Sequence, residues 1–169
     1  MGYGLRWAKP AMPLLWAEIL MLVLDINLRD QKAYIRRDST VLGDYAISSS
    51  KFGVGFEKGS FKTPVGKFKV FEKIGEGEPM NTIFQMRKPK GVWDKTKNEN
   101  DLILTRIIWI EGLDLENSST KDRHIYFHGT NHEDLIGVPS SSGCIRFKNE
   151  DIIHLFNLIE ADTEIIIRG

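Results

Sequence analysis

The chain of 169 residues is predicted to fold as one mostly β, α+β domain with a single clear helix near its C-terminus. Two observations support this prediction. Most apolar runs are short, rich in β-branched and aromatic residues, and separated by polar breaks that suit hairpins. Only a segment near the C-terminus spaces its apolar residues as a helix does. The charge is balanced, with 23 basic and 23 acidic residues, and gives no electrostatic case for a nucleic acid or an anionic membrane as a partner.

The apolar runs place seven strands in order along the chain. They are predicted at 20–28, 32–36, 41–48, 67–74, 102–110, 124–129 and 163–169. The helix is predicted over 149–160, with Asn149 as a candidate N-cap. Its apolar residues fall at i, i+3, i+4 and i+7 and share one face: Ile152, Leu155, Phe156 and Ile159.

Two long segments between strands are expected to serve the site. The first is the glycine-rich loop (residues 48–66), which no helix pattern follows, so a dinucleotide-binding loop is rejected and a substrate-facing loop is expected. The second, residues 75–101, is polar and is expected to form a long loop over the site or along one side of it.

Residues 1–18 are expected to form an N-terminal extension, and residues 19–169 the domain. The extension has an apolar run, but Pro10, Pro13 and Glu18 interrupt it and no small-residue cleavage site follows. We therefore expect no export signal, no membrane insertion and a cytoplasmic location, with the periplasm as the alternative.

The chemistry of the chain is expected at its only cysteine, Cys144. A thiol is a nucleophile only as the thiolate, and His128, brought close by the fold, can take its proton. Gly143 lets the backbone approach a reacting carbonyl, so that the N–H groups of Gly143 and Cys144 form a candidate oxyanion hole. Tyr126 lies on the same strand face as His128 and is a further candidate donor.

These residues stand in a pattern that resembles the catalytic motif of the L,D-transpeptidase (YkuD-type) family. His128 is followed by Gly129 and Thr130, and residues 141–146 read Ser-Ser-Gly-Cys-Ile-Arg. Ser142 stands where the family has a second histidine. Thr63, Pro64 and Gly66 match the family's Thr-Pro-x-Gly signature, and the C-terminal segment is similar to its closing helix and strand.

The resemblance implies a β-sandwich or barrel fold and an enzyme that acts on peptidoglycan tetrapeptide stems. Cys144 would attack the carbonyl of the third residue, a diamino acid, and D-alanine would leave. The carbonyl of Gly129 would orient His128, and no metal or organic cofactor is implied. We expect water to resolve the thioester, as in an L,D-carboxypeptidase that recycles soluble muropeptides; the alternative is an amine acceptor and a 3→3 cross-link.

The candidate substrate-binding residues are Arg146, Tyr126, Ser141, Ser142 and Thr130. For Arg146 two interpretations stay open: it binds the free carboxylate of the substrate, or it braces its loop through backbone carbonyls.

Other classes of function are weighed against this one. His124, His128 and His132 would form a metal-binding face only on a helix, and the strand composition of the segment disfavours zinc. A papain-like protease needs a helix that starts at the cysteine and a later catalytic histidine, whereas His128 precedes Cys144 here and the sequence around Cys144 is not helical. A non-catalytic peptidoglycan-binding module remains the alternative of another class.

Overall fold

The computed structural model describes residues 21–96 and 100–169. The predicted extension of residues 1–18 lies outside the described residues, and its boundary with the domain stays a prediction. The described chain forms ten strands, which are β1 (Leu22–Asn27), β2 (Lys32–Arg37), β3 (Thr40–Ser48), β4 (Gly66–Ile74), β5 (Thr82–Gln85), β6 (Lys88–Val92), β7 (Ile103–Gly112), β8 (Tyr126–Gly129), β9 (Ile145–Phe147) and β10 (Glu164–Arg168). A short 3-10 helix, η1 (Glu133–Leu135), and one α-helix, α1 (Asn149–Leu158), complete it.

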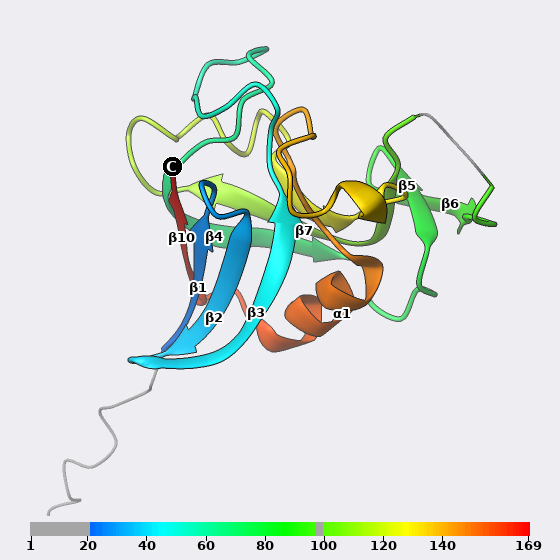
Figure 1. Cartoon of the computed structure of the whole chain (residues 1–169), viewed down its shortest axis with the longest axis horizontal. Helices are drawn as coiled ribbons and strands as arrows, with labels where there is room; N and C mark the ends of the chain where they lie inside the picture. The colour runs from blue at the N-terminus through cyan, green and yellow to red at the C-terminus, as the bar shows by residue number, and fades with distance from the viewer. Residues whose placement is uncertain (1–20, 97–99) are drawn as a thin grey trace, which may run out of the picture.

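The strands form one sheet that closes on itself. Their order is β4-β10-β1-β2-β3-β9-β8-β7-β5-β6, and β4 also pairs with β7. The first eight strands of this order therefore make a barrel, which confirms the predicted mostly β fold. Closure leaves these strands without a free edge. Figure 1 shows the curved sheet, with the β5–β6 hairpin standing outside it at one end of β7.

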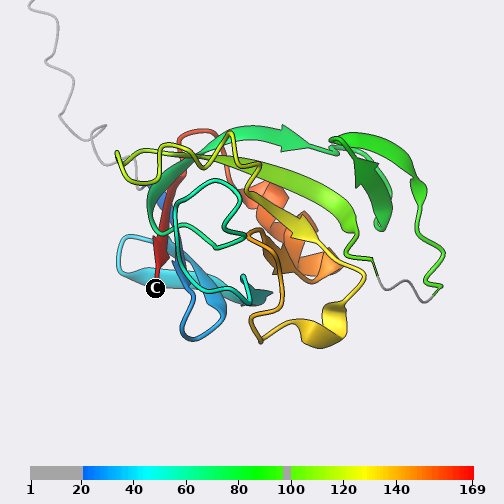
Figure 2. The ribbon, with the colours of Figure 1, turned by 90° about the horizontal axis from the view of Figure 1, so that it is seen from above.

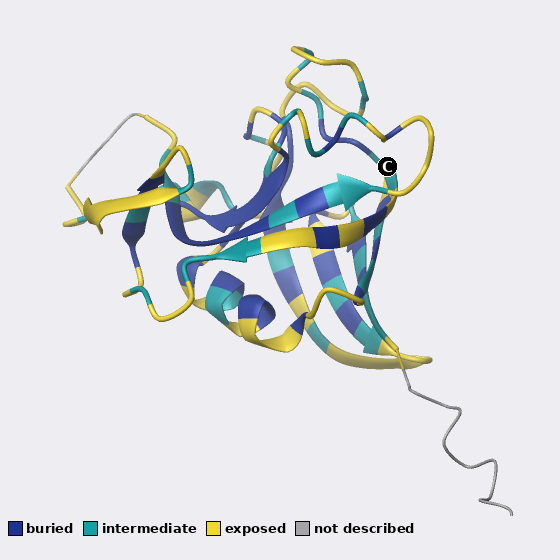
Figure 3. Ribbon diagram, turned by 180° about the vertical axis from the view of Figure 1, so that it is seen from behind, coloured by how far each residue is buried: buried dark blue, intermediate teal, exposed yellow. Residues whose placement is uncertain are grey.

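Helix α1 covers one side of the barrel and completes its core (Figures 1 and 2). The predicted apolar face is confirmed, because Ile152, Leu155, Phe156 and Ile159 are all buried in the main hydrophobic cluster. Figure 3 shows the buried residues of the helix facing the sheet and its exposed residues facing outward. Within the described ranges, no helix has the length and apolar character needed to cross a membrane.

All seven predicted strands are present, with ends that differ by a few residues. The prediction that Asn149 is the N-cap is wrong: Lys148 occupies the N-cap position, and Asn149 is the first helical residue. The buried Asn149 side chain turns inward to other elements instead. The helix also ends at Leu158, two residues before the predicted end.

The segment 75–101 differs from the single long loop that was predicted. It contains the β5–β6 hairpin, and β6 is exposed along its whole length (Figure 3). Its polar composition hid these strands, since an exposed hairpin carries no run of buried apolar residues. Strand β9 was also missed, because three residues are too few to show an alternating pattern.

Candidate active site

The parallel pairing of β8 with β9 positions the nucleophile and the base. In its register, Phe127 lies opposite Ile145 and His128 opposite Arg146. Cys144, directly before β9, therefore falls beside Tyr126, and the Tyr126 N–H lies 3.3 Å from the Cys144 Sγ. His128 is two residues further along β8, on the same strand face as Tyr126. The pairing of β8 with β9 thus places Cys144 beside Tyr126, two residues before His128 on the neighbouring strand.

Both groups are uncharged at neutral pH in this environment. Burial raises the pKa of the Cys144 thiol to about 11, against the lowering effects of the Tyr126 N–H, Arg146 and Arg123. Burial also lowers the pKa of His128, although the nearby Asp101 carboxylate opposes this shift. The Cys144 side chain is only partly exposed, and its thiol donates to the His124 carbonyl at 3.5 Å. The resting site therefore holds a thiol and a neutral imidazole.

The tautomer of His128 follows from its backbone contact. The Nδ1 atom lies 2.7 Å from the carbonyl oxygen of Gly129. A carbonyl only accepts, so Nδ1 carries the proton and Nε2 keeps the lone pair that a general base needs. This is the contact that the family resemblance implies for Gly129.

Asn149 holds the turn that contains Gly129 and Thr130. Its Nδ2 donates to the Thr130 carbonyl at 2.8 Å, and its Oδ1 accepts from the Thr105 hydroxyl at 2.5 Å. A Cβ on Gly129 would collide with the Asn149 Oδ1. The Thr130 side chain is buried and its hydroxyl accepts the His132 N–H at 3.0 Å, contacts that do not support its assignment to substrate binding, which stays a prediction.

The loop before Cys144 is held by two hydroxyl groups and leaves little room for a side chain at Gly143. Gly143 has φ +122°, and a Cβ there would lie 3.3 Å from the Ile125 Cδ1. The Thr63 hydroxyl donates to the Gly143 carbonyl at 2.9 Å, a contact that was missed because Thr63-Pro64 reads as a turn in the sequence. The Ser141 hydroxyl donates to the Cys144 carbonyl at 2.5 Å. Ser141 is buried and shapes this loop, which does not support its assignment to substrate binding; that assignment also stays a prediction.

The predicted oxyanion hole is only partly available. The Gly143 N–H already donates to the Ser141 hydroxyl, at 3.3 Å. Its use for an oxyanion requires this contact to be exchanged. The Tyr126 hydroxyl accepts from Arg87 at 3.0 Å and keeps its own proton to donate. Burial raises the Tyr126 pKa, which keeps the hydroxyl protonated. Its role as a donor stays a prediction.

Arg146 is engaged within the protein. Its guanidinium is buried, pairs with the Asp101 carboxylate and donates to the Ser140 hydroxyl at 3.0 Å. The prediction that it binds the substrate carboxylate is not supported, because a carboxylate of the chain already occupies it. It braces the loop, through the side chains of Ser140 and Asp101 rather than the backbone carbonyls of the second interpretation. Asp101, 45 residues away in sequence, gave no signal of this pairing.

A small cavity of about 200 Å³ lies beside Cys144, between the glycine-rich loop and the segment that enters β8. It is lined by Lys58, Gly59, Phe61, Asp122, Arg123, His124, Ile125 and Ser142. Of the predicted site residues, Ser142 is the one that faces it. Figures 1 and 2 show the glycine-rich loop beside the segment before β9, and Ser50 bridges to Ser141 between them. The expectation that this loop faces the site agrees with this placement.

A larger cavity of about 470 Å³ lies away from Cys144, at the start of α1. Its lining includes Trp93, Asn131, Glu133, Lys148 and Asp151. In the described part of the chain, no group of three or more His, Cys, Asp and Glu residues is arranged to hold a metal ion.

Comparisons with known proteins show which family the sequence and the fold resemble. A family model described as the L,D-transpeptidase catalytic domain (YkuD) matches residues 22–167. The chain is similar to a Bacillus subtilis protein named "Putative L,D-transpeptidase YqjB", with 29% identity over 143 residues, which are 84% of this chain and 68% of that protein.

Solved structures share the fold. An L,D-transpeptidase from Mycobacterium smegmatis superposes with a TM-score of 0.57 at 15% identity, over 88% of this chain and 59% of that one. L,D-transpeptidase 3 from Mycobacterium tuberculosis, in complex with a faropenem-derived adduct, gives a TM-score of 0.57 at 15% identity, over 88% of this chain and 60% of that one. The chain thus spans about three-fifths of these solved relatives.

Proposed function

Because the chain belongs to the L,D-transpeptidase catalytic domain family, we propose that it is a cysteine acyl-transfer enzyme acting on peptidoglycan tetrapeptide stems. It cleaves the bond between the third residue, a diamino acid, and the terminal D-alanine, through a thioester on Cys144. The observation that supports this proposal is the placement of Cys144 beside β8, two register positions from a neutral imidazole whose Nδ1 is fixed by the Gly129 carbonyl.

The proposed reaction uses one proton acceptor twice. The Nε2 of His128 takes the Cys144 proton as Sγ attacks the carbonyl carbon of the third residue. The carbon–nitrogen bond then breaks, His128 returns the proton to the leaving amine, and D-alanine departs. In the second half, His128 deprotonates the acceptor, which attacks the thioester and releases the Cys144 thiol.

Water is the proposed acceptor, which gives a tripeptide and makes the enzyme an L,D-carboxypeptidase. The second candidate is an L,D-transpeptidase, in which an amine of another stem attacks and a 3→3 cross-link forms; the name of the Bacillus subtilis relative favours it. We also propose a cytoplasmic location, where soluble muropeptides would be the substrates. Fractionation of cells that express the native gene tests this location.

Product analysis tests the proposed function. Purified muropeptide tetrapeptide is incubated with the protein and with Cys144→Ala, His128→Ala and His154→Ala, and the products are identified by mass spectrometry. The control residue His154 lies on α1, where it contacts Tyr45. Tripeptide and free D-alanine, lost only in the first two variants, are expected. Cross-linked dimers would establish the transpeptidase instead, and no product of either kind would favour a binding module.

Capture by a β-lactam provides a second prediction. Imipenem, a carbapenem, is expected to acylate Cys144 and add its full mass to the protein, because the thiolate can open the strained lactam as it opens an amide. Intact-mass spectrometry before and after incubation checks this, with Cys144→Ala as the control. An unchanged mass in the parent protein would count against an acylable thiol.

A further inference from the structure

The cavity beside Cys144 is lined by charged residues of both signs. We propose that it binds the end of that residue's side chain and is built for one that carries both an ammonium and a carboxylate, as meso-diaminopimelate does, over one that carries an ammonium alone, as lysine does. Lys58 and Arg123 take the carboxylate, and Asp122 takes the ammonium. This inference rests on the proposed function and names the substrate of the same site.

The position of the cavity assigns it to the acyl half of the substrate. His128 lies beyond Tyr126 along β8, whereas the cavity is lined by residues 122–125, which come before it. The cavity and the base therefore lie on opposite sides of Cys144. His128 must protonate the leaving amine, so D-alanine occupies the side of the base. The carbonyl of the third residue forms the thioester with Sγ, so the rest of that residue lies on the cavity side of Cys144.

The size of the cavity fits one side chain. Its volume of about 200 Å³ is below the roughly 300–1,000 Å³ of pockets that enclose a drug-sized ligand. It therefore suits the end of one long side chain and is too small for a second peptide stem.

The charges around the cavity match a zwitterionic group. Lys58 and Asp122 are exposed at its rim, and Arg123 is partly buried in its wall. Arg123 donates to the Gly55 carbonyl at 3.1 Å, the Ser60 hydroxyl at 3.3 Å and the Lys62 carbonyl at 2.6 Å. These contacts use three of the five N–H donors of a guanidinium, so two remain for a carboxylate. The same contacts hold the arginine rigidly against the glycine-rich loop.

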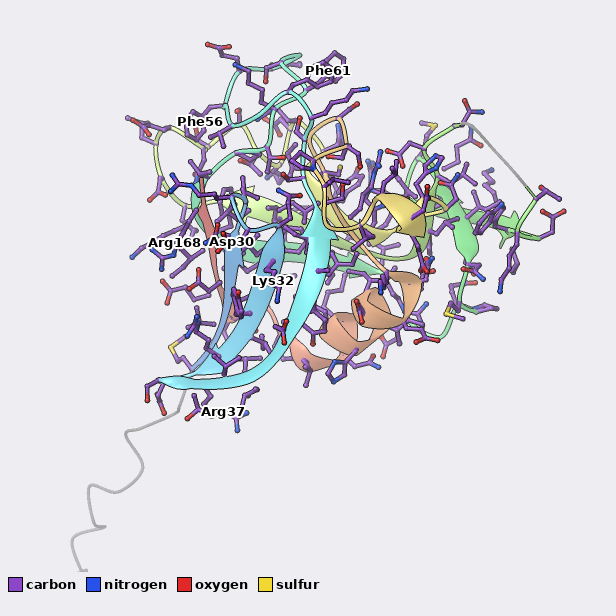
Figure 4. The ribbon with its side chains drawn as sticks, in the orientation of Figure 1. Asp30, Lys32, Arg37, Phe56, Phe61 and Arg168 are labelled. Atoms are coloured by element: carbon purple, nitrogen blue, oxygen red, sulfur yellow. The ribbon has the colours of Figure 1, made fainter. Side chains whose placement is uncertain are left out.

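Phe61 completes the cavity in a strained conformation. Its φ is +59°, which is unusual for a bulky residue, and its side chain is 58% exposed. The hydroxyl of Ser50 donates to its carbonyl at 2.5 Å and helps to hold it there. Figure 4 shows Phe61 at the tip of the molecule, on the glycine-rich loop. Strain of this kind is maintained at binding sites, and the exposed ring here can cover the methylene groups of the bound side chain.

Three tetrapeptides that differ only in the third residue test the proposal: meso-diaminopimelate, its side-chain carboxamide, and L-lysine. D-alanine release is measured as kcat/KM, so that water and amine acceptors are both counted. The parent protein is expected to prefer the diaminopimelate peptide over the other two by about tenfold, the gain of a charge-assisted hydrogen bond in a partly buried site.

Substitutions of two exposed residues test the carboxylate and the ammonium of the bound side chain separately. Lys58→Met is expected to lower kcat/KM about threefold for the diaminopimelate peptide and to leave the carboxamide and lysine peptides unchanged. Asp122→Asn is expected to lower kcat/KM for all three peptides, because each retains the ammonium. Lys90→Met, which removes an exposed lysine on β6, is the matched control and should change none of them.

The outcomes separate this inference from the proposed function. Equal rates on all three peptides, unaltered by Lys58→Met, would overturn the inference and leave the proposed function standing. Release of D-alanine from none of them would overturn both. A preference for lysine over diaminopimelate would show that the cavity is occupied by another part of the stem.

Discussion

At the scale of single residues, burial determines the protonation states of Cys144 and His128. Burial raises the pKa of the Cys144 thiol to about 11 and lowers the pKa of His128, and both shifts favour the uncharged pair over a thiolate–imidazolium pair at pH 7. We therefore expect proton transfer to His128 to accompany attack on the substrate. The partly exposed thiol is also protected from oxidation, since the reactive form is the thiolate.

Alkylation of Cys144 by iodoacetamide is expected to be slow at pH 7 and to rise about tenfold per pH unit up to pH 10. The sign follows from the raised pKa: below it the thiol is protonated, and the thiolate fraction grows tenfold with each unit of pH. The rate is read by intact-mass spectrometry at several pH values. A plateau already reached at pH 7 would show a preformed thiolate.

Gly143 is the residue whose backbone most directly fixes the nucleophile. Gly143→Ala is expected to lose about 1–2 kcal/mol of stability from its positive φ and most of its activity, because the Cβ would press on Ile125. Gly91→Ala is the matched control: Gly91 has φ +119° but no atom within 4 Å of the added Cβ. Denaturant melts and D-alanine release are measured for both. Full activity in Gly143→Ala would contradict the role of this loop.

At the scale of elements, helix α1 supports the base. Its first residue, Asn149, ties the turn after β8 to β7 through Thr130 and Thr105. The Glu133 carboxylate of η1 accepts the Asn149 N–H at 2.7 Å and its Nδ2 at 2.8 Å. Three elements thus meet at one side chain, directly behind the carbonyl that orients His128.

Asn149→Ala is therefore expected to destabilise the fold by about 1–3 kcal/mol, since it leaves buried polar groups without partners. It should also lower kcat with little change in KM, because His128 loses its fixed orientation and the substrate cavity lies elsewhere. Asn157→Ala, an exposed position on the same helix, is the control. A loss of stability with unchanged kcat at 25 °C would mean that Asn149 has a structural role alone.

At the scale of the whole molecule, the fold class and the candidate nucleophile and base could be predicted from the sequence, whereas most of the contacts around them could not. The strands with buried apolar runs and the family motif could be predicted because their signals are local. The contacts that shape the site join distant segments: Thr63 reaches Gly143, and Asp101 reaches Arg146. No spacing in the sequence encodes such pairs. The barrel itself depends on the pairing of β4 with β7, which only the fold brings together.

The most direct test of the central claim is the detection of an acyl-enzyme on Cys144. The protein is mixed with the diaminopimelate tetrapeptide, quenched in acid within seconds, and measured by intact-mass and peptide-mapping spectrometry. A mass increase equal to the tripeptide acyl group, located on the Cys144 peptide and removed by hydroxylamine, is predicted. Release of D-alanine by Cys144→Ala at the parental rate would contradict the account.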